Sequence, residues 1–565
     1  MSTAEATVIG KWSRLAPELL AMIFLDVIAL HERKPILFLP ADEYYLENEI
    51  DTKPLLALSH ICRYWRDVAL RTPALWTRVH GRRQDQMEAF LERSRPLAVT
   101  LFLDAEYQGG DWDGPLPDHI ASVVEAHGSR LRRLDLSMVP TWDHVAPLLA
   151  ELQASELECL TIALTTSGSF ERDIPLSWGP LLDDETSSLR ALALIPVTDW
   201  LPSSTFPHLT HLALFFDPET PPLQHPIDLL RLLSNVPALA FLHVDFLLYD
   251  GPYTGNWQPP SDPVPLHHLR TLVFTACSYK ILRIVISRLS LPEGVFIRLQ
   301  DIDNRLAIDG PPAPLSPLPL RPVTSLDVLT QDEKILLVAD GSASGLWLEA
   351  HHDPEGAAQP PDWVGWLLTL HECLTLSHVT YLHIYIEGRE PFWPAFLAHL
   401  PQVSHLAVLF DVSGDEVDYR NGLYDSPTTI LCDALGQEAP VLCPDLHKLN
   451  IEWPEEIMSE NFDSLPRLAA MLGTRSGAGH AIRHVVVQAP RCPPFNDVQG
   501  LDFVQALARS VGPLDLELEV VEKEDTDKGL CAFEMRDVWQ VDGEERYWEL
   551  GDDYKPRYDV SPVQY

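Results

Sequence analysis

Closely paired cysteines are missing from this sequence. Its 565 residues contain eight cysteines, and no two of them form a C-x-x-C pair. This scatter argues against a disulfide framework and against a structural zinc site. It is typical of a protein from a reducing compartment, so we expect the chain to act in the cytoplasm or the nucleus.

Long hydrophobic runs are also missing. The longest apolar stretches, such as 19–30, are interrupted by charge or are too short to span a bilayer. The N-terminus does not have the basic region and apolar core of a secretory signal peptide. With 46% hydrophobic and 22% charged residues, the composition fits a globular chain of two or three domains, and we expect no membrane partner.

The sequence contains none of the common motifs of catalysis or cofactor binding. No glycine-rich loop has the spacing that cradles a phosphate or a dinucleotide, and none of the 22 histidines forms an H-E-x-x-H motif. The stretch 341–345 is similar to a nucleophile elbow, but its central residue is Ala343 and not serine. We therefore expect no cofactor, no metal and no enzymatic activity, with an unrecognised active site as an open alternative.

Basic residues are scarce outside the first part of the chain. The net charge is −41, yet residues 1–95 hold 13 basic and 13 acidic side chains, so residues 96–565 carry all of it. A body this acidic repels phosphate backbones, which argues against nucleic acid as a partner. The excess predicts either a solvated surface or, where it lines a binding face, a protein target with a basic surface.

The stretch 15–76 has the pattern of two packed helices. Pro17 suits a first helical turn, and apolar residues that recur four apart predict a helix ending at Leu30. A second apolar stripe, with three-then-four spacing over 55–69, predicts another helix, which Pro73 brings to an end. A unit this small cannot bury both stripes alone. It either packs on the rest of the chain or offers an apolar face to a partner.

The same stretch resembles an F-box of the kind common in large fungal families. The resemblance rests on L-A-P-E-L-L near the start and T-P-A-L-W at the end, although the join over 31–54 is longer than in a typical F-box. An F-box binds a small Skp-type adaptor that links it to a cullin–RING ubiquitin ligase, so the resemblance implies these partners. By position, the implied adaptor-binding residues, some of which must form the internal core, are Leu15, Pro17, Leu19, Leu20, Ile23, Phe24, Leu58, Cys62, Trp65, Leu75 and Trp76.

After residue 96 one pattern recurs: an apolar residue, two variable residues, a leucine, one variable residue and another apolar residue. Each copy predicts a short strand, and helical stretches such as 119–127 and 279–289 lie between copies. The alternation resembles leucine-rich repeats, whose parallel strands line one face and whose helices line the other. The copies begin at Leu131, Leu157, Leu189, Leu209, Leu239, Leu269, Val323, Val379, Val403, Leu446 and Ile482.

These patterns together predict an α/β fold in which an N-terminal helical F-box precedes an irregular, leucine-rich-repeat-like solenoid of parallel strands and helices. The expected domains are 1–95, the F-box region; 96–520, the solenoid with a proline-rich insertion at 311–319; and 521–565, an acidic aromatic tail or a cap on the last repeat. A helical hairpin and a generic alternating α/β domain are the simpler alternatives for the first two.

The resemblance implies that the chain is a substrate-recognition adaptor of an SCF-type cullin–RING ubiquitin ligase. In such a protein the F-box binds the Skp-type adaptor, and the repeat domain binds the protein that is to be ubiquitinated. The alternative is a repeat scaffold for protein–protein interaction that recruits no ligase. The sequence does not identify the target protein.

Overall fold

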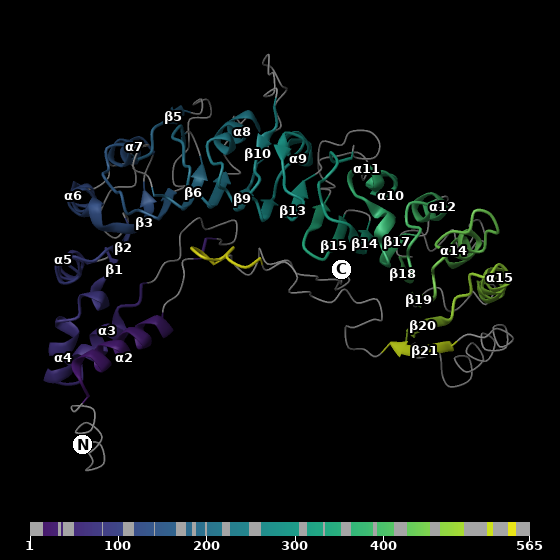
Figure 1. Cartoon of the computed structure of the whole chain (residues 1–565), viewed down its shortest axis with the longest axis horizontal. Helices are drawn as coiled ribbons and strands as arrows, with labels where there is room; N and C mark the ends of the chain where they lie inside the picture. Colours follow the sequence, from purple (N-terminus) through teal and green to yellow (C-terminus); the bar gives the residue numbers. More distant parts are fainter. Residues whose placement is uncertain are drawn as a thin grey trace, which may run out of the picture. The chain divides into compact units, whose positions relative to one another are not determined.

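The computed structural model of the chain describes residues 15–31, 36–37, 50–81, 83–104, 118–139, 142–164, 177–182, 188–197, 200–216, 226–247, 262–303, 314–331, 334–351, 363–387, 392–411, 427–452, 464–490, 517–523 and 541–549. Its contacts divide the chain into two compact units. Unit 1 consists of Met1–Pro259, Val264–Leu269 and Gln540–Pro556, and unit 2 of Pro260–Pro263, Arg270–Trp539 and Arg557–Tyr565. Both units are mixed α/β, and each contains mostly parallel strands (Figure 1). The domain boundaries expected at residues 95 and 520 stay a prediction.

The first elements of unit 1 are short helices: α2 (Pro17–Leu30), α3 (Lys53–His60), α4 (Arg63–Leu70) and the 3-10 turn η1 (Pro73–Trp76). The prediction of the first helix is confirmed at both ends. The prediction of one continuous helix over 55–69 is wrong, because Cys62 has an extended backbone, with φ −157° and ψ 170°. The Sγ of Cys62 accepts the N–H of Trp65 at 3.5 Å, which caps the start of α4.

The sheet of unit 1 is parallel, and its strands pair in the order β1–β2–β3–β4–β6–β8–β9. Strands β5 and β7 form a separate parallel pair. Helices α6, α7 and α8 lie on one side of the main strands (Figure 1). The bounds are β1 (Arg78–His80), α5 (Gln84–Arg93), β2 (Val99–Asp104), α6 (Asp118–His127), η3 (Gly128–Arg130), β3 (Leu131–Val139), α7 (Trp142–Ala150), β4 (Cys159–Leu164), β5 (Ser177–Gly179), β6 (Ala191–Val197), β7 (Trp200–Pro202), β8 (His211–Phe216), α8 (Pro226–Ser234), β9 (Phe241–Asp245) and β10 (Val264–Pro265).

The parallel register sorts the side chains of this sheet into rows, and successive residues of a strand point to opposite faces. One row is apolar and buried on every strand: Val79, Leu101, Leu134, Leu160, Leu192, Leu212 and Leu242. The next row is mixed and points to the other face: His80, Phe102, Asp135, Thr161, Ala193, Ala213 and His243. The leucine that recurs in the sequence pattern therefore belongs to the apolar row.

Unit 2 is built in the same way, with helices α9, α10, α12, α14 and α15 on one side of its strands (Figure 1). Its elements are β11 (Thr271–Thr275), α9 (Tyr279–Ile286), β12 (Leu289–Ser290), β13 (Phe296–Asp303), β14 (Val323–Gln331), β15 (Lys334–Gly341), β16 (Gly345–His351), α10 (Trp363–Leu368), α11 (Leu370–Cys373), η4 (Leu376–His378), β17 (Tyr381–Glu387), α12 (Phe392–Leu397), β18 (His405–Asp411), α14 (Pro427–Leu435), β19 (Lys448–Glu452), α15 (Ser464–Gly477), β20 (His484–Pro490) and β21 (Glu517–Lys523).

The expectation of an irregular solenoid of parallel strands does not hold at one place in unit 2. Strands β14, β15 and β16 form an antiparallel meander, while β13 pairs with β16 and β14 pairs with β17 in parallel. The connections are short, and the N–H of Gly341 donates to the carbonyl of Ser344 at 3.0 Å in the turn between β15 and β16. Such short connections permit only antiparallel neighbours, because a parallel crossover needs a dozen or more residues.

The described part of the proline-rich stretch, 314–319, has no regular secondary structure, in agreement with an extended insertion. The Nε of Arg283 donates to the carbonyl of Pro314 at 3.2 Å, and the N–H of Leu318 donates to the carbonyl of Cys373 at 3.0 Å. These bonds fix the stretch to α9 and α11. Strands on both sides of it, β13 and β17, belong to one sheet of unit 2.

Candidate functional site

Helix α2 has one buried apolar face and one exposed apolar face. Leu20 and Phe24 are fully buried, one turn apart. On the other side, Leu19 is 51% exposed and Met22 is 60% exposed. A helix that is apolar on most of its circumference is normally buried all round, so the exposed face of α2 is the part of this helix that a partner would cover.

Helices α3 and α4 pack on α2 and complete its buried side. The rings of Phe24 and Trp65 lie 5.1 Å apart between centroids, and Trp65 is only partly buried. The hydroxyl of Tyr64 donates to the carbonyl of Leu15 at 2.5 Å, which fixes the start of α2 to α4. The break at Cys62 leaves Ile61 49% exposed in the turn between α3 and α4.

Trp76 holds this helical cluster to the rest of unit 1. Its Nε1 donates to the carbonyl of Ala69 at 2.8 Å, and its ring meets Phe90 of α5 edge-on at 4.8 Å. The guanidinium carbon of Arg93 lies 4.5 Å from the centroid of the same ring. Trp76 is 1% exposed and the adjacent Leu75 is 4% exposed. Both residues are therefore core residues in this structure, where no partner could reach them.

The structure thus divides the adaptor-binding residues implied by the F-box resemblance. The side chains of Leu20, Phe24, Leu75 and Trp76 are buried, whereas Pro17 and Leu19 are exposed. The partly buried members of the set are Leu15, Ile23, Leu58, Cys62 and Trp65.

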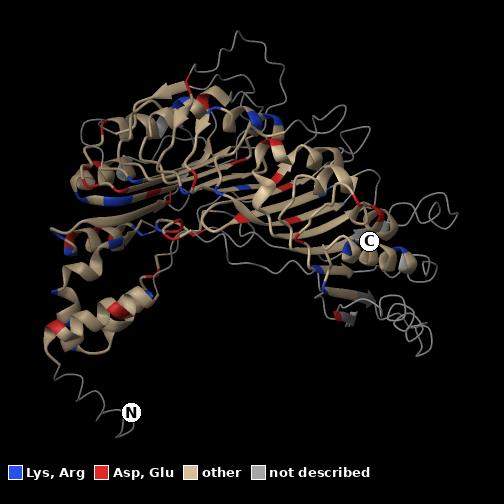
Figure 2. Cartoon of the chain, turned by 45° about the vertical axis from the view of Figure 1, so that its right-hand side comes forward, with Lys and Arg blue, Asp and Glu red and all other residues tan. Residues whose placement is uncertain are grey.

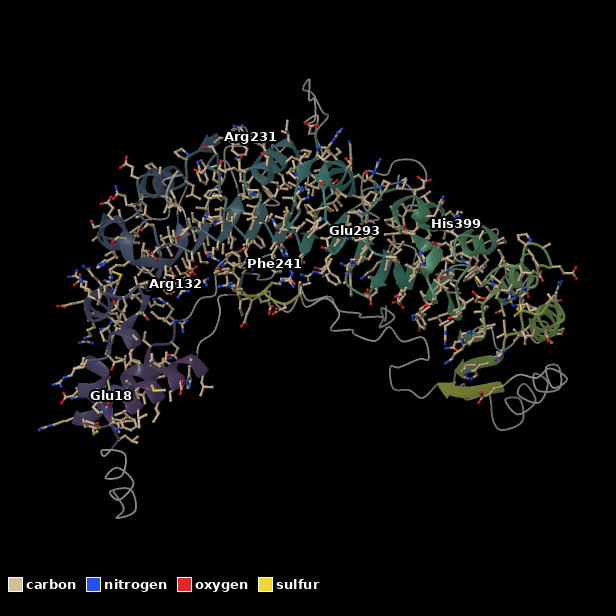
Figure 3. The ribbon with its side chains drawn as sticks, in the orientation of Figure 1. Glu18, Arg132, Arg231, Phe241, Glu293 and His399 are labelled. Atoms are coloured by element: carbon tan, nitrogen blue, oxygen red, sulfur yellow. The ribbon has the colours of Figure 1, made fainter. Side chains whose placement is uncertain are left out.

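Sequence reasoning missed several exposed apolar residues of the helical cluster. They are Met22, Leu25, Leu30, Leu56, Ile61 and Leu70, and each is at least 36% exposed. The sequence of α2 did indicate exposed apolar residues, because only Glu18 and Asp26 of this helix are charged and a helix with apolar residues on nearly every side cannot bury all of them in a small cluster. Figure 3 labels Glu18 near the start of this helix.

A second surface lies on the face of the unit 1 sheet that carries the mixed row. Segment 541–549 crosses this face, with Tyr547 8% and Trp548 5% exposed. The Nε1 of Trp548 donates to the hydroxyl of Thr161 on β4 at 3.1 Å. This segment therefore docks on the sheet of unit 1, and the expectation of a tail or cap over 521–565 stays a prediction.

His211 of β8 is the main polar contact beneath segment 541–549. Its Nε2 donates to the carbonyl of Gly543 at 2.9 Å, and its ring stacks on Phe241 of β9, labelled in Figure 3, at 4.5 Å. The ring of Tyr547 meets it edge-on at 4.9 Å. Burial lowers the pKa of His211 to about 4, against the opposing effect of the Gly543 carbonyl. His211 is therefore neutral at physiological pH.

Charges of both signs occur on the strands as well as on the helices of the described residues (Figure 2). On the face beneath segment 541–549, Arg133 and Asp135 of β3 form an ion pair of 2.7 Å, with the Asp135 side chain fully buried. The net charge of residues 96–565 allowed for an acidic binding face, but on this face an acidic side chain is paired with an arginine. A basic surface on the target stays a prediction.

The described residues offer no obvious centre for catalysis. Among them, no group of three or more His, Cys, Asp or Glu side chains is placed to hold a metal ion. Burial raises the pKa of the thiols of Cys159, Cys373, Cys432 and Cys443 to about 12, so they stay protonated and unreactive. No helix in the described part of the chain has the length and apolar character of a membrane span.

Comparison of the chain with known protein families, with curated proteins and with solved structures found no match.

Proposed function

We propose that the chain is a substrate-recognition adaptor of an SCF-type cullin–RING ubiquitin ligase. In this proposal the α2–α4 cluster is an F-box that binds a Skp-type adaptor, and through it a cullin. The observation that carries the proposal is the exposed apolar face of α2, where Leu19 and Met22 are 51% and 60% exposed although Leu20 and Phe24 fill the opposite face.

Burial of this face supplies a physical reason for partner binding. A leucine or methionine that becomes fully covered contributes about 1.5–3 kcal/mol. Leu25, on the same helix, is 38% exposed and would add to the contact area. An apolar patch of this kind on a small helical cluster is typical of a protein-binding surface rather than of an ordinary solvated face.

We further propose that the strands of the two units are divergent leucine-rich-repeat-like units that hold the target protein. The sequential parallel pairing in unit 1 and its apolar row of leucines support this assignment. The antiparallel meander β14–β16 would then be an insertion in the repeat pattern of unit 2. A repeat array presents an extended face of side chains, which suits recognition of another protein.

The direct test is a titration of the full chain with purified Skp-type adaptor. The double variant Leu19→Ala/Met22→Ala should bind at least tenfold more weakly than the wild type, because two apolar side chains leave the interface. Leu97→Ala is the matched control, since Leu97 is 39% exposed but lies between α5 and β2, outside the helical cluster. Both variants should keep the wild-type unfolding temperature, because substitutions at exposed positions change stability little.

Equal affinity of the wild type and the double variant would refute the proposed interface. Absence of adaptor binding by the folded wild-type chain would favour the alternative, a repeat scaffold that recruits no ligase. The two outcomes are distinct, because the first still leaves the chain bound to the adaptor by another surface.

A further inference from the structure

Segment 541–549 lies across the unit 1 sheet, on the side away from α6–α8 (Figure 1). Strands β2, β3, β4, β6 and β8 each have a hydrogen-bonded neighbour on both sides within this sheet. The segment extends no strand of it, and its one described bridge joins Glu549 to Ile36. Removing the segment would therefore leave the hydrogen bonds of the sheet intact.

The surface beneath the segment includes several small side chains, and Phe102, Ile195 and Phe215 belong to the same buried cluster. Ala163, Ala191, Ala193, Ala213 and Cys159 lie in the same buried cluster as the two aromatic residues of the segment. Small residues on neighbouring strands leave room above the sheet for rings that larger residues would exclude. The surface is thus shaped for two adjacent aromatic side chains, and Tyr547 and Trp548 fill it.

Most of the hydrogen bonds that unit 1 makes to the segment go to its backbone carbonyls. Nη1 of Arg133 donates to the carbonyl of Tyr547 at 2.7 Å, and Nε2 of His211 donates to the carbonyl of Gly543 at 2.9 Å. The N–H of Leu37 donates to the carbonyl of Glu549 at 3.1 Å. Backbone bonds combined with pockets for particular side chains are the usual means of recognising an extended peptide.

The fit of the segment is incomplete, unlike that of a core strand. The hydroxyl of Tyr547 is buried without a hydrogen-bond partner among the described residues. Asp542 and Arg546 of the segment are exposed, whereas Glu544, Glu545 and Glu549 are partly buried. A buried polar group without a partner weakens docking, and a segment held in this way is suited to exchange.

We propose that this face of unit 1 binds an extended peptide with two adjacent aromatic residues, and that segment 541–549 is its internal occupant. The peptide of a target protein replaces the segment by occupying the same alanine-lined surface and the same donors, Arg133 and His211. The segment reads V-D-G-E-E-R-Y-W-E, so the favoured partner is an extended peptide that contains an adjacent tyrosine and tryptophan. This inference rests on the proposed function in that it assigns the target-binding face of the substrate adaptor.

The test uses a labelled synthetic peptide of residues 541–549 and the full chain. The variant Tyr547→Ala/Trp548→Ala empties the surface in the chain itself, and it should bind the peptide at least tenfold more tightly than the wild type. A control peptide with both aromatic residues replaced by alanine should not bind. Skp-type adaptor affinity, measured on the same samples, should not change, so that failure of the peptide test and failure of the proposed function are distinguished.

A folded double variant that does not bind the peptide would overturn the inference and make the segment a fixed part of the core. If the double variant does not fold, a protease site inserted between residues 524 and 540 of the otherwise wild-type chain provides the second test. After cleavage, the released segment should exchange with the labelled peptide while unit 1 stays folded. A cleaved chain that unfolds, or that retains its segment against excess peptide, would also overturn the inference.

Discussion

Mild acid should weaken the packing of segment 541–549 on unit 1 through His211. The side chain of His211 is 4% exposed, and it lies beneath Tyr547 and Trp548. Burial lowers its pKa from 6.5 to about 4; the carbonyl of Gly543 raises the pKa, and the nearby Arg546 lowers it. The histidine therefore stays neutral in the folded chain at a pH where the unfolded chain protonates it.

The direction of the effect follows from proton uptake. Below pH 6.5 the unfolded chain binds a proton at His211 that the folded chain does not bind, so stability falls as the pH is lowered, until about pH 4. The complete shift corresponds to about 3 kcal/mol. Between pH 7.5 and pH 5.5, the loss from this one group is about 1.3 kcal/mol.

The assay is urea unfolding at these two pH values, both above the isoelectric point of about 4.7. The reference variant His211→Gln keeps an N–H donor for Gly543 but takes up no proton. The wild type should lose about 1.3 kcal/mol more than His211→Gln on going to the lower pH. His208→Gln, at an exposed position on the same connection, should behave as the wild type does.

Exposing His211 to water should reduce this dependence of stability on pH. Adding Tyr547→Ala/Trp548→Ala should reduce the pH-dependent difference, because the ring then faces water in both states. A wild-type chain whose stability relative to His211→Gln is the same at both pH values, within about 0.3 kcal/mol, would refute a buried neutral histidine.

Two further predictions concern unit 2 and the target. Arg475→Leu should lower the free energy of unfolding, measured in urea, by about 2–4 kcal/mol. The reason is that the buried guanidinium donates to the carbonyls of Leu435, Leu442 and Cys443. The control Arg467→Leu, on the exposed side of the same helix, should lower it by less than about 0.5 kcal/mol. Raising salt from about 50 to about 300 mM should slow the association of a basic target, whereas Skp-type adaptor binding through apolar contacts should barely respond; surface-based kinetics would measure both, and a target association rate that does not change with salt would contradict the charge argument.

The strand positions could be predicted because one residue of each pattern has a fixed structural role. Leu134, Leu160, Leu192 and Leu212 occupy a single buried row, so a polar residue at any of them would face an apolar environment. The pattern does not show the direction of a strand, since the same six-residue pattern of apolar residues is compatible with parallel and with antiparallel pairing. The antiparallel meander β14–β16 was therefore missed.

Two features of the candidate surfaces had no local signal. The apolar spacing continues through Cys62, so it did not reveal that the backbone becomes extended there and exposes Ile61. The docking of Tyr547 on unit 1 depends on contacts with Arg133, 414 residues away in sequence. Aromatic residues in an acidic stretch indicated that the stretch could dock, but the contacts with unit 1 that determine where it docks are distant in sequence.

The most direct test of the proposed ligase function is assembly of the full chain with purified Skp-type adaptor and cullin. Size-exclusion chromatography with light scattering would measure the mass of the complex. The proposal predicts that the three proteins elute together at the mass of one copy of each, and that Leu19→Ala/Met22→Ala shifts the chain to a separate peak while Leu97→Ala does not. A folded wild-type chain that elutes alone, in the presence of a preformed adaptor–cullin complex, would contradict the proposal.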